Sequence, residues 1–317
     1  MTNSEIEQRA RTARDLFEFL AGWKALALQG EESEVVKADI VSGSEPFVLQ
    51  MVLNKIPPEE REALRQLDSY RRTIYNNSVM MDAGYGRKER VFANLYDALF
   101  AHLKMHGEKE TVNDNYRGHL DSRWKLEASY YRSLSDRTAP HDDRANVISS
   151  FYGIHVVPVD ESNDEQLAPQ LARIREKYPK VKLNDLTPLQ KEAVIQHYVS
   201  GTKLLDFTKS IYVAAFFATN NFSQQISKTR PEFGAIYRIA NIEINELSMG
   251  QVEAPELPMR FARIHRQRGV FLKIRFRGAI NDPGLWARWV FRHTNVAYPF
   301  HCAQHQITLD HLLPEEI

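Results

Sequence analysis

Residues 195–220 read IQHYVSGTKLLDFTKSIYVAAFFATN, and this stretch carries two kinds of secondary structure in quick succession. The run TKLLDFT, residues 202–208, predicts a short strand. It is followed by SIYVAAFFATNNF, which is apolar nearly all round and predicts a buried helix. Upstream, Thr187 and Pro188 mark another helix start, because threonine caps free N–H groups and proline fits the first turn. The segment therefore predicts helix, strand and helix in that order.

Further elements downstream do not follow a regular alternation of strands and helices. GAIYRIA at residues 234–240 and GVFLKIRF at residues 269–276 predict strands, the second with one apolar face at the two-residue period. PGLWARWVFRH at residues 283–293 predicts a helix. The mixture favours an α+β fold with small, mainly antiparallel sheets and flanking helices.

The first part of the chain predicts helices alone. Residues 5–28 have apolar side chains at spacings of three and four, and residues 58–81 begin with a proline and several acids. Residues 87–107 predict a third amphipathic helix. We therefore divide the chain into a helical region, residues 1–108, and an α+β domain, residues 109–317.

Composition narrows the class of protein. The 317 residues carry 41 basic and 41 acidic side chains, so the net charge of +0 gives no overall basic footprint for nucleic acid. The single cysteine, Cys302, excludes an internal disulfide and favours a reducing compartment. The N-terminus lacks an apolar signal core, and no apolar run is long enough to span a membrane. We expect a cytoplasmic protein without membrane contact.

Familiar sequence motifs for phosphate, zinc or nucleophilic chemistry are absent. The segment HTNVAYPFHCAQH holds His293, His301, Cys302 and His305, which are residue types that bind zinc. Only one thiolate is present and no second cluster supports it, so we predict no metal site.

Three separated blocks follow one another along the chain: Tyr116-Arg117-Gly118, then Gln196-His197-Tyr198 with Leu204-Leu205-Asp206-Phe207-Thr208, then Gln267-Arg268-Gly269. In this order they resemble the FRG domain family, which is named for a Phe/Tyr-Arg-Gly start. The resemblance covers residues 110–300. It departs from the family where Val199-Ser200-Gly201 replaces Gly-Ile-Pro, where Lys203 replaces arginine and where Phe207 replaces tryptophan.

The side chains of these blocks suit a ligand with phosphates and a planar ring. Arg117 provides a forked donor for phosphate, and Gly118 would let a ligand approach the backbone closely. His197, Asp206 and Thr208 offer hydrogen bonds. Trp124, Tyr198 and Phe207 are rings that could stack on a base, although we favour a role for Trp124, with Leu126 and Tyr130, in anchoring the segment in the core.

A weaker similarity links the order of these blocks to arginine-class ADP-ribosyltransferases. It implies that an arginine on the first strand grips nicotinamide adenine dinucleotide (NAD) as substrate, and that a late glutamate holds the ribose. Here Gln267 stands at that late position, and a glutamine cannot stabilise positive charge as a carboxylate does. Asp206 or Glu127 remain open as substitutes, and Glu243, Glu246, Glu253 and Glu256 are unplaced.

The predicted site follows from these comparisons. The candidate catalytic residues are Arg117, His197, Thr208 and Gln267. The candidate dinucleotide-binding residues are Tyr116, Gly118, Gln196, Tyr198, Asp206 and Phe207. The resemblance implies an NAD-dependent ADP-ribosyltransferase or NAD glycohydrolase with an open acceptor, either nucleic acid or protein.

Two other readings stay open. The domain would instead be a non-catalytic module for nucleotides or nucleic acid, using the basic run Arg263, His265, Arg266 and Arg268. In the structural reading, Arg117 and Asp206 form a buried ion pair and Thr208 caps the following helix. The N-terminal helices would bind a partner or form a dimer, as in a toxin–antitoxin or phage-defence system, and the oligomeric state is open.

Overall fold

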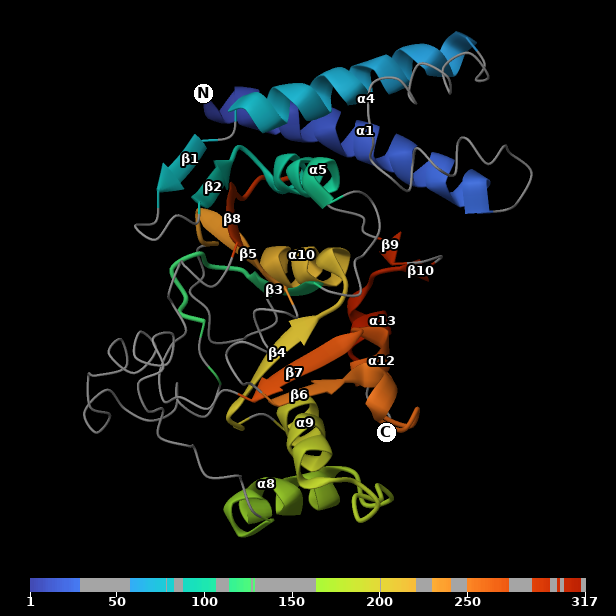
Figure 1. The fold of residues 1–317 in the computed structure, drawn as a ribbon, viewed down its shortest axis with the longest axis vertical. Helices are drawn as coiled ribbons and strands as arrows, with labels where there is room; N and C mark the ends of the chain where they lie inside the picture. The colour runs from blue at the N-terminus through green and yellow to red at the C-terminus, as the bar shows by residue number, and fades with distance from the viewer. Residues whose placement is uncertain are drawn as a thin grey trace.

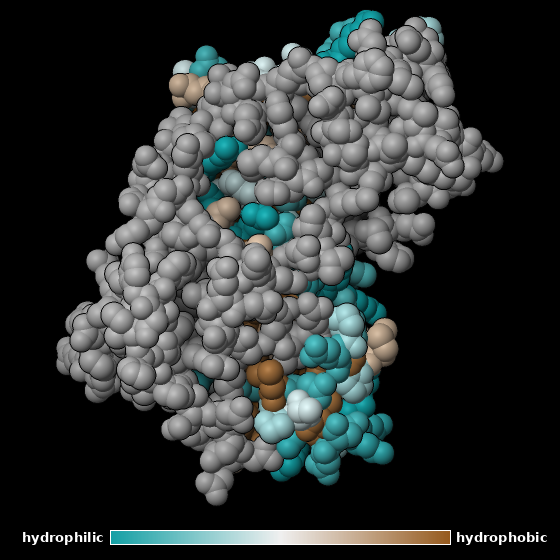
Figure 2. Space-filling model, in the orientation of Figure 1, coloured by the Kyte–Doolittle hydropathy of each residue, from teal (hydrophilic) through white to brown (hydrophobic). Residues whose placement is uncertain are grey.

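A computed structural model of the protein describes residues 1–28, 58–77, 79–82, 88–106, 114–126, 128, 164–199, 201–220, 230–240, 250–273, 287–296, 301–302 and 305–314. Strands and helices are interspersed, with two long N-terminal helices lying across one end of the molecule (Figure 1). Hydrophilic residues dominate the described surface at the opposite end, around α8 and α12 (Figure 2). No helix in the described ranges is long and apolar enough to cross a membrane.

The centre of the fold is a mixed sheet in the order β1-β2-β8-β5-β3-β4-β7-β6. All neighbours are antiparallel except β2 and β8. The strands are β1 (Val79–Asp82), β2 (Lys88–Phe92), β3 (Asp114–His119), β4 (Leu204–Thr208), β5 (Phe233–Ala240), β6 (Gly250–Glu253), β7 (Gly269–Lys273) and β8 (Ala287–Arg292). A small hairpin joins β9 (His301–Cys302) and β10 (His305–Gln306). The predicted α+β class with mainly antiparallel strands is confirmed.

The sheet is nearly divided between β3 and β4. These strands pair at one position, Tyr116 opposite Thr208. By contrast, β3 pairs with β5 along its whole length, and β4 pairs with β7 in the same way. The eight strands therefore form two parts, β1-β2-β8-β5-β3 and β4-β7-β6, which meet at a single residue pair.

Helices cover both parts of the sheet. α1 (Asn3–Leu28), α4 (Pro58–Asn77), α5 (Leu95–His106) and α10 (Ile211–Thr219) share one buried core that includes Tyr116, Trp289 and Phe291. α8 (Asp164–Lys177), α9 (Pro188–Tyr198) and the short α12 (Ala262–Arg266) share another with Leu204 and Phe271. The 3₁₀ helix η1 (Ala254–Glu256) precedes α12, and α13 (Leu309–Leu312) lies near it.

Helix α10 lies directly on β3 because Gly118 has no side chain. A Cβ added to Gly118 would lie 1.8 Å from the carbonyl oxygen of Ala214 and 2.8 Å from the amide nitrogen of Ala218. The close approach that the sequence suggested at Gly118 is thus made by a helix of the protein itself. Glycine at this position lets helix and strand backbones touch.

Several predicted elements are confirmed by the structure. Thr187 caps α9 in a reciprocal capping box with Gln190, and Pro188 is its first residue. The expected strands near residues 202–208, 234–240 and 269–276 are β4, β5 and β7. The buried helix expected after Ser210 is α10.

The helix predicted for residues 283–293 is wrong, because residues 287–292 form β8. Trp289 and Phe291 enter the core beneath α5 and α10, and Val290 enters the core on the other face. Since both faces are covered, residues 289–291 form an unbroken apolar run, which periodicity cannot distinguish from part of a buried helix.

The helix predicted for residues 87–107 is correct only in its second half. Residues 88–92 form β2, and α5 begins at Leu95. The Asn94 side chain accepts the N–H of Asp97 at 3.0 Å, which caps the helix and sets its start. The division of the chain at residue 108 stays a prediction, but β1 and β2 from the first part pair within the main sheet.

A buried ionic network ties the three N-terminal helices together. Asp97 of α5 accepts the hydroxyl of Tyr70 at 2.6 Å and lies 2.8 Å from Nε of Arg9 on α1. The side chain of Asp97 is 1% exposed. Burial raises the pKa of Asp97 to about 6, although Arg9 opposes this shift.

We predict that Gly118→Ala destabilises the fold by about 3 kcal/mol or more, because the new methyl group overlaps the α10 backbone. Urea denaturation would measure the change. Gly269→Ala is the matched control, since its added Cβ would meet the Ile264 side chain at 3.2 Å and no closer group. Equal losses in the two variants would contradict the proposed role of Gly118.

Asp97 should make the stability depend on pH. A carboxyl with a folded-state pKa of about 6 binds its proton more tightly folded than unfolded, where the value is about 3.9. Its contribution is therefore largest below pH ~4, falls by about 3 kcal/mol as pH rises to about 6, and is then constant. We expect Asp97→Asn to abolish this component, measured as the difference in unfolding free energy from wild type between pH 4 and 7. A difference that is constant with pH would contradict it.

Candidate functional site

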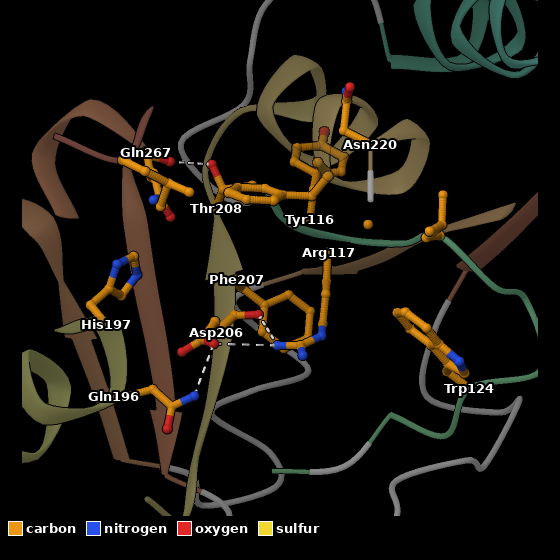
Figure 3. Close-up of a pocket in the computed structure, with 15 residues that line it drawn as sticks. Tyr116, Arg117, Trp124, Gln196, His197, Asp206, Phe207, Thr208, Asn220 and Gln267 are labelled. Atoms are coloured by element: carbon orange, nitrogen blue, oxygen red, sulfur yellow. Dashed lines mark hydrogen bonds and ion pairs between the residues drawn. The ribbon is translucent and has the colours of Figure 1, made fainter. Parts of the chain in front are cut away.

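A cavity of about 340 Å³ opens where β3 and β4 separate (Figure 3). Its volume lies at the lower end of the range of about 300–1,000 Å³ typical of ligand pockets. It is lined by Tyr116, Arg117, Gly118, Leu120, Trp124, Gln196, His197, Asp206, Phe207, Thr208, Ala214, Phe217, Asn220, Gln267 and Leu313. Nine of the ten candidate residues are among them, so the three sequence blocks meet at one place.

Arg117 spans the gap between the two parts of the sheet. Its Nη1 donates to the main-chain carbonyl of Asp206 at 2.6 Å, and its Nε donates to Nε2 of His119 at 3.0 Å. The carboxylate of Asp206 is farther away, at 4.0 Å from Nη1. Because β3 and β4 pair only at Tyr116 and Thr208, this side chain supplies a cross-strand hydrogen bond that the backbone does not make. The expected ion pair is therefore mainly a bond to the backbone.

Asp206 is held on one side only. The amide nitrogen of Gln196 donates to Oδ2 at 3.0 Å, and the amide oxygen of Gln196 accepts the hydroxyl of Thr202 at 2.7 Å. The other oxygen, Oδ1, is buried and has no hydrogen-bond partner among the described residues. Since the side chain is 37% exposed and an ionised carboxylate accepts about four bonds, Asp206 keeps capacity for donors from a ligand.

His197 presents a neutral ring to the pocket. Burial lowers the pKa of His197 to about 4, an effect that Asp206 opposes and Arg263 reinforces. The ring meets Phe271 edge-on with centroids 4.9 Å apart. No hydrogen bond holds the ring within the described part of the chain, whereas the main-chain carbonyl accepts Nη1 of Arg263 at 2.9 Å. At neutral pH the imidazole can therefore donate or accept but carries no charge.

Thr208 and Gln267 are engaged with the protein itself. The hydroxyl of Thr208 donates to the Gln267 carbonyl at 2.6 Å and accepts the N–H of Ser210 at 3.0 Å. The amide of Gln267 donates to the Leu312 carbonyl at 2.7 Å. Both residues are buried. Thr208 thus supports the start of α10, as the structural reading suggested, while both residues also border the cavity.

The aromatic candidates lie in different places. Trp124 is 38% exposed and lines the cavity, so its reading as a core anchor is wrong. Phe207 and Tyr116 are buried but reach the cavity wall. Tyr198 does not line the cavity, because its ring packs under the guanidinium of Arg263 at 4.7 Å. Leu126 is fully buried, as expected, and Tyr130 lies outside the described residues.

No glutamate lines the cavity in the described part of the chain. Glu253 ends β6 and Glu256 belongs to η1, and neither reaches the cavity. Glu127, Glu243 and Glu246 lie outside the described residues. Asp206 is therefore the carboxylate that the described residues bring to this cavity.

Sequence reasoning missed five lining residues, Leu120, Ala214, Phe217, Asn220 and Leu313. Phe217 lies in α10 and Asn220 directly follows this helix, and nothing in the local sequence distinguishes either residue from its neighbours. Leu313 follows α13 near the other end of the chain and carries no local signal.

The basic run around α12 is only partly available to a ligand. Arg263 bonds the carbonyls of His197 and Pro314, and the His265 ring lies 2.9 Å from the carbonyl oxygen of Leu257. Arg266 and Arg268 are exposed. No three His, Cys, Asp or Glu side chains gather as metal ligands in the described ranges.

We predict that His197 titrates with a midpoint near pH 4, well below an ordinary histidine at about 6.5. Burial disfavours the charged imidazolium and so keeps the ring neutral at pH 7. Histidine NMR signals followed from pH 3 to 8 would measure the midpoint, with His197→Gln used to assign the signal. A midpoint above pH 6 would contradict this account of the site.

Comparison with known proteins supports the first two blocks. The FRG domain family model matches residues 113–226, a shorter segment than the 110–300 expected and one that ends before the Gln267 block. No curated protein and no solved structure matches the chain significantly. The matched segment, residues 113–226, contains β3, β4 and α10 and is similar to the FRG domain family.

Proposed function

We propose that the cavity binds NAD as substrate and that the protein is an NAD-dependent ADP-ribosyltransferase or NAD glycohydrolase. The observation that carries the proposal is the Asp206 carboxylate, which borders the cavity with a side chain that is 37% exposed. A ribose offers adjacent hydroxyl donors, which the exposed part of this carboxylate would accept.

The other lining groups fit the remaining parts of a dinucleotide. Arg117 places a fixed positive charge at the wall, suited to a phosphate. Trp124 is an exposed ring at the cavity, suited to stacking on a base or a nicotinamide. His197, neutral by virtue of its burial, would donate or accept a hydrogen bond.

The residues also suggest which side chain would assist the chemistry. NAD would supply a glycosidic bond whose cleavage leaves positive charge on the ribose. A carboxylate stabilises such charge and an amide does not. Asp206 would therefore take the role that the sequence comparison gave to the position of Gln267, because the Gln267 amide is already bonded to Leu312.

The acceptor of the ADP-ribosyl group stays open between nucleic acid and protein, with water as acceptor in a glycohydrolase. Such chemistry would suit a toxin or a phage-defence effector in the cytoplasm. The acceptor and the biological setting are proposed from the resemblance of the three sequence blocks, and no further contact in the cavity supports them.

A second candidate is a non-catalytic nucleotide-binding FRG module. It is favoured by the bonds of Arg117, whose guanidinium is committed to the Asp206 carbonyl and to His119. An arginine held in this way would recognise a phosphate without moving during a reaction. Binding of NAD without any release of nicotinamide would support this second candidate.

The direct test is incubation of the protein with NAD, with chromatography to detect free nicotinamide, and calorimetry to measure binding. Labelled NAD with DNA, RNA and mixed protein added in turn would reveal the acceptor. If the protein neither binds NAD nor releases nicotinamide from it, both candidates are refuted for this ligand.

We predict that Asp206→Asn lowers kcat for nicotinamide release by about 10²–10³-fold with a smaller change in KM, because the lost charge acts mainly in the transition state. Met259→Ala is the control, since Met259 is 75% exposed and does not line the cavity. Thermal melting would verify that Asp206→Asn is folded. A folded variant with wild-type kcat would exclude Asp206 from this role.

A further inference from the structure

Leu313 brings a distant part of the chain to the cavity. It follows α13 and lines the cavity together with Thr208 and Gln267. Its half-buried side chain also packs against the core under α10. The preceding Leu312 is fully buried in the same core, so the backbone beside Leu313 is anchored.

Side chains of α12 and the residue after it hold the turn formed by residues 309–314. The Gln267 amide donates to the Leu312 carbonyl at 2.7 Å, and Nη2 of Arg263 donates to the Pro314 carbonyl at 3.2 Å. Carbonyls at the end of a helix have no partner within the helix. These donors therefore bond the carbonyl at the end of α13 and a carbonyl just beyond it, and so fix residues 309–314 against α12.

Arg263 and Gln267 also make hydrogen bonds to two other residues of the cavity wall, His197 and Thr208. Arg263 donates to the His197 carbonyl at 2.9 Å through its other terminal nitrogen. The main-chain carbonyl of Gln267 accepts the Thr208 hydroxyl at 2.6 Å. Arg263 and Gln267 thus set the distance of the 309–314 turn from α9 and β4, and with it the position of Leu313 relative to His197 and Thr208.

We propose that Leu313 is a specificity-determining residue of the ligand pocket and that Gln267 and Arg263 are positioning residues that hold it in place. The proposal rests on the proposed function in taking NAD as the ligand. Leucine offers no hydrogen-bond donor to phosphate oxygens, so the group that it contacts is the apolar face of the adenine or nicotinamide ring and not a phosphate. Its side chain would limit the size of that ring.

Replacing Leu313 tests the wall directly. The quantity compared is the dissociation constant for NAD divided by that for an analogue with an enlarged ring. We expect this ratio to be about tenfold higher in Leu313→Ala than in wild type, because the lost methyl groups make room in an apolar pocket. The analogues are 1,N6-etheno-NAD, enlarged at adenine, and 3-benzoylpyridine adenine dinucleotide, enlarged at the nicotinamide substituent. Leu313→Trp should weaken all three ligands. Calorimetric dissociation constants give the ratios, with Met259→Ala as the matched control.

The positioning role of Gln267 has its own readout. Gln267→Met keeps the length of the side chain but removes the donor to Leu312, so the 309–314 turn is no longer held. We expect the same shift in ligand preference as in Leu313→Ala. A purely structural role would lower the melting temperature and leave the ratio of dissociation constants unchanged.

The outcomes separate this proposal from the proposed function. If wild type binds NAD but neither analogue ratio changes in folded Leu313→Ala, the wall role is wrong and the proposed function stands. If wild type binds no dinucleotide, the proposed function is wrong, and the wall is tested with the planar dye anilinonaphthalene sulfonate. Dye binding that is weakened by Leu313→Trp but not by Met259→Ala then supports the wall, and equal binding by all variants overturns it.

Discussion

The site depends on the single residue pair that joins β3 to β4. Backbone pairing stops after Tyr116 and Thr208, so two well-formed parts of one sheet separate and leave space between their edges. A strand edge without a partner exposes carbonyl and N–H groups that need other bonds. Arg117 supplies one of them through its bond to the Asp206 carbonyl. The cavity is thus a consequence of incomplete pairing, and its charged lining follows from the bonds that replace it.

Two close contacts keep the separated edges in place. Gly118 lets the α10 backbone lie directly on β3, which fixes the β3 edge against the helical core. The Thr208 hydroxyl donates to the Gln267 carbonyl and accepts the N–H of Ser210, which fixes the β4 edge against the segments next to α12 and α10. Gly118 and the Thr208 hydroxyl therefore hold the two strand edges in place, while larger polar side chains line the cavity between these edges.

The lining residues differ in what they leave for a ligand. Arg117, Thr208 and Gln267 already make hydrogen bonds within the protein, so their main contribution is to hold the walls. Asp206 has an oxygen without a partner, and the His197 ring is uncharged and makes no hydrogen bond with the described residues. From residue type alone, each of these polar side chains would be expected to bind a ligand. Only their hydrogen bonds in the folded protein show which of them are already engaged.

The sequence by itself determined the α+β class, the strands β4, β5 and β7, several helices such as α1, α9 and α10, and the residues of the three blocks that meet at the cavity. These features depend on local capping and periodicity, as at Thr187, or on short runs of residues, of which the FRG family model matches the first two blocks. The tertiary structure decided that residues 287–292 form a strand, because burial on both faces erases the period that would have revealed it. It also decided the roles of the polar residues. Arg117 meets Asp206 across 89 positions, Thr208 meets Gln267 across 59 and Gln267 meets Leu312 across 45. Bonds between residues so far apart leave no local pattern, so only the folded chain shows which donors and acceptors remain for a ligand.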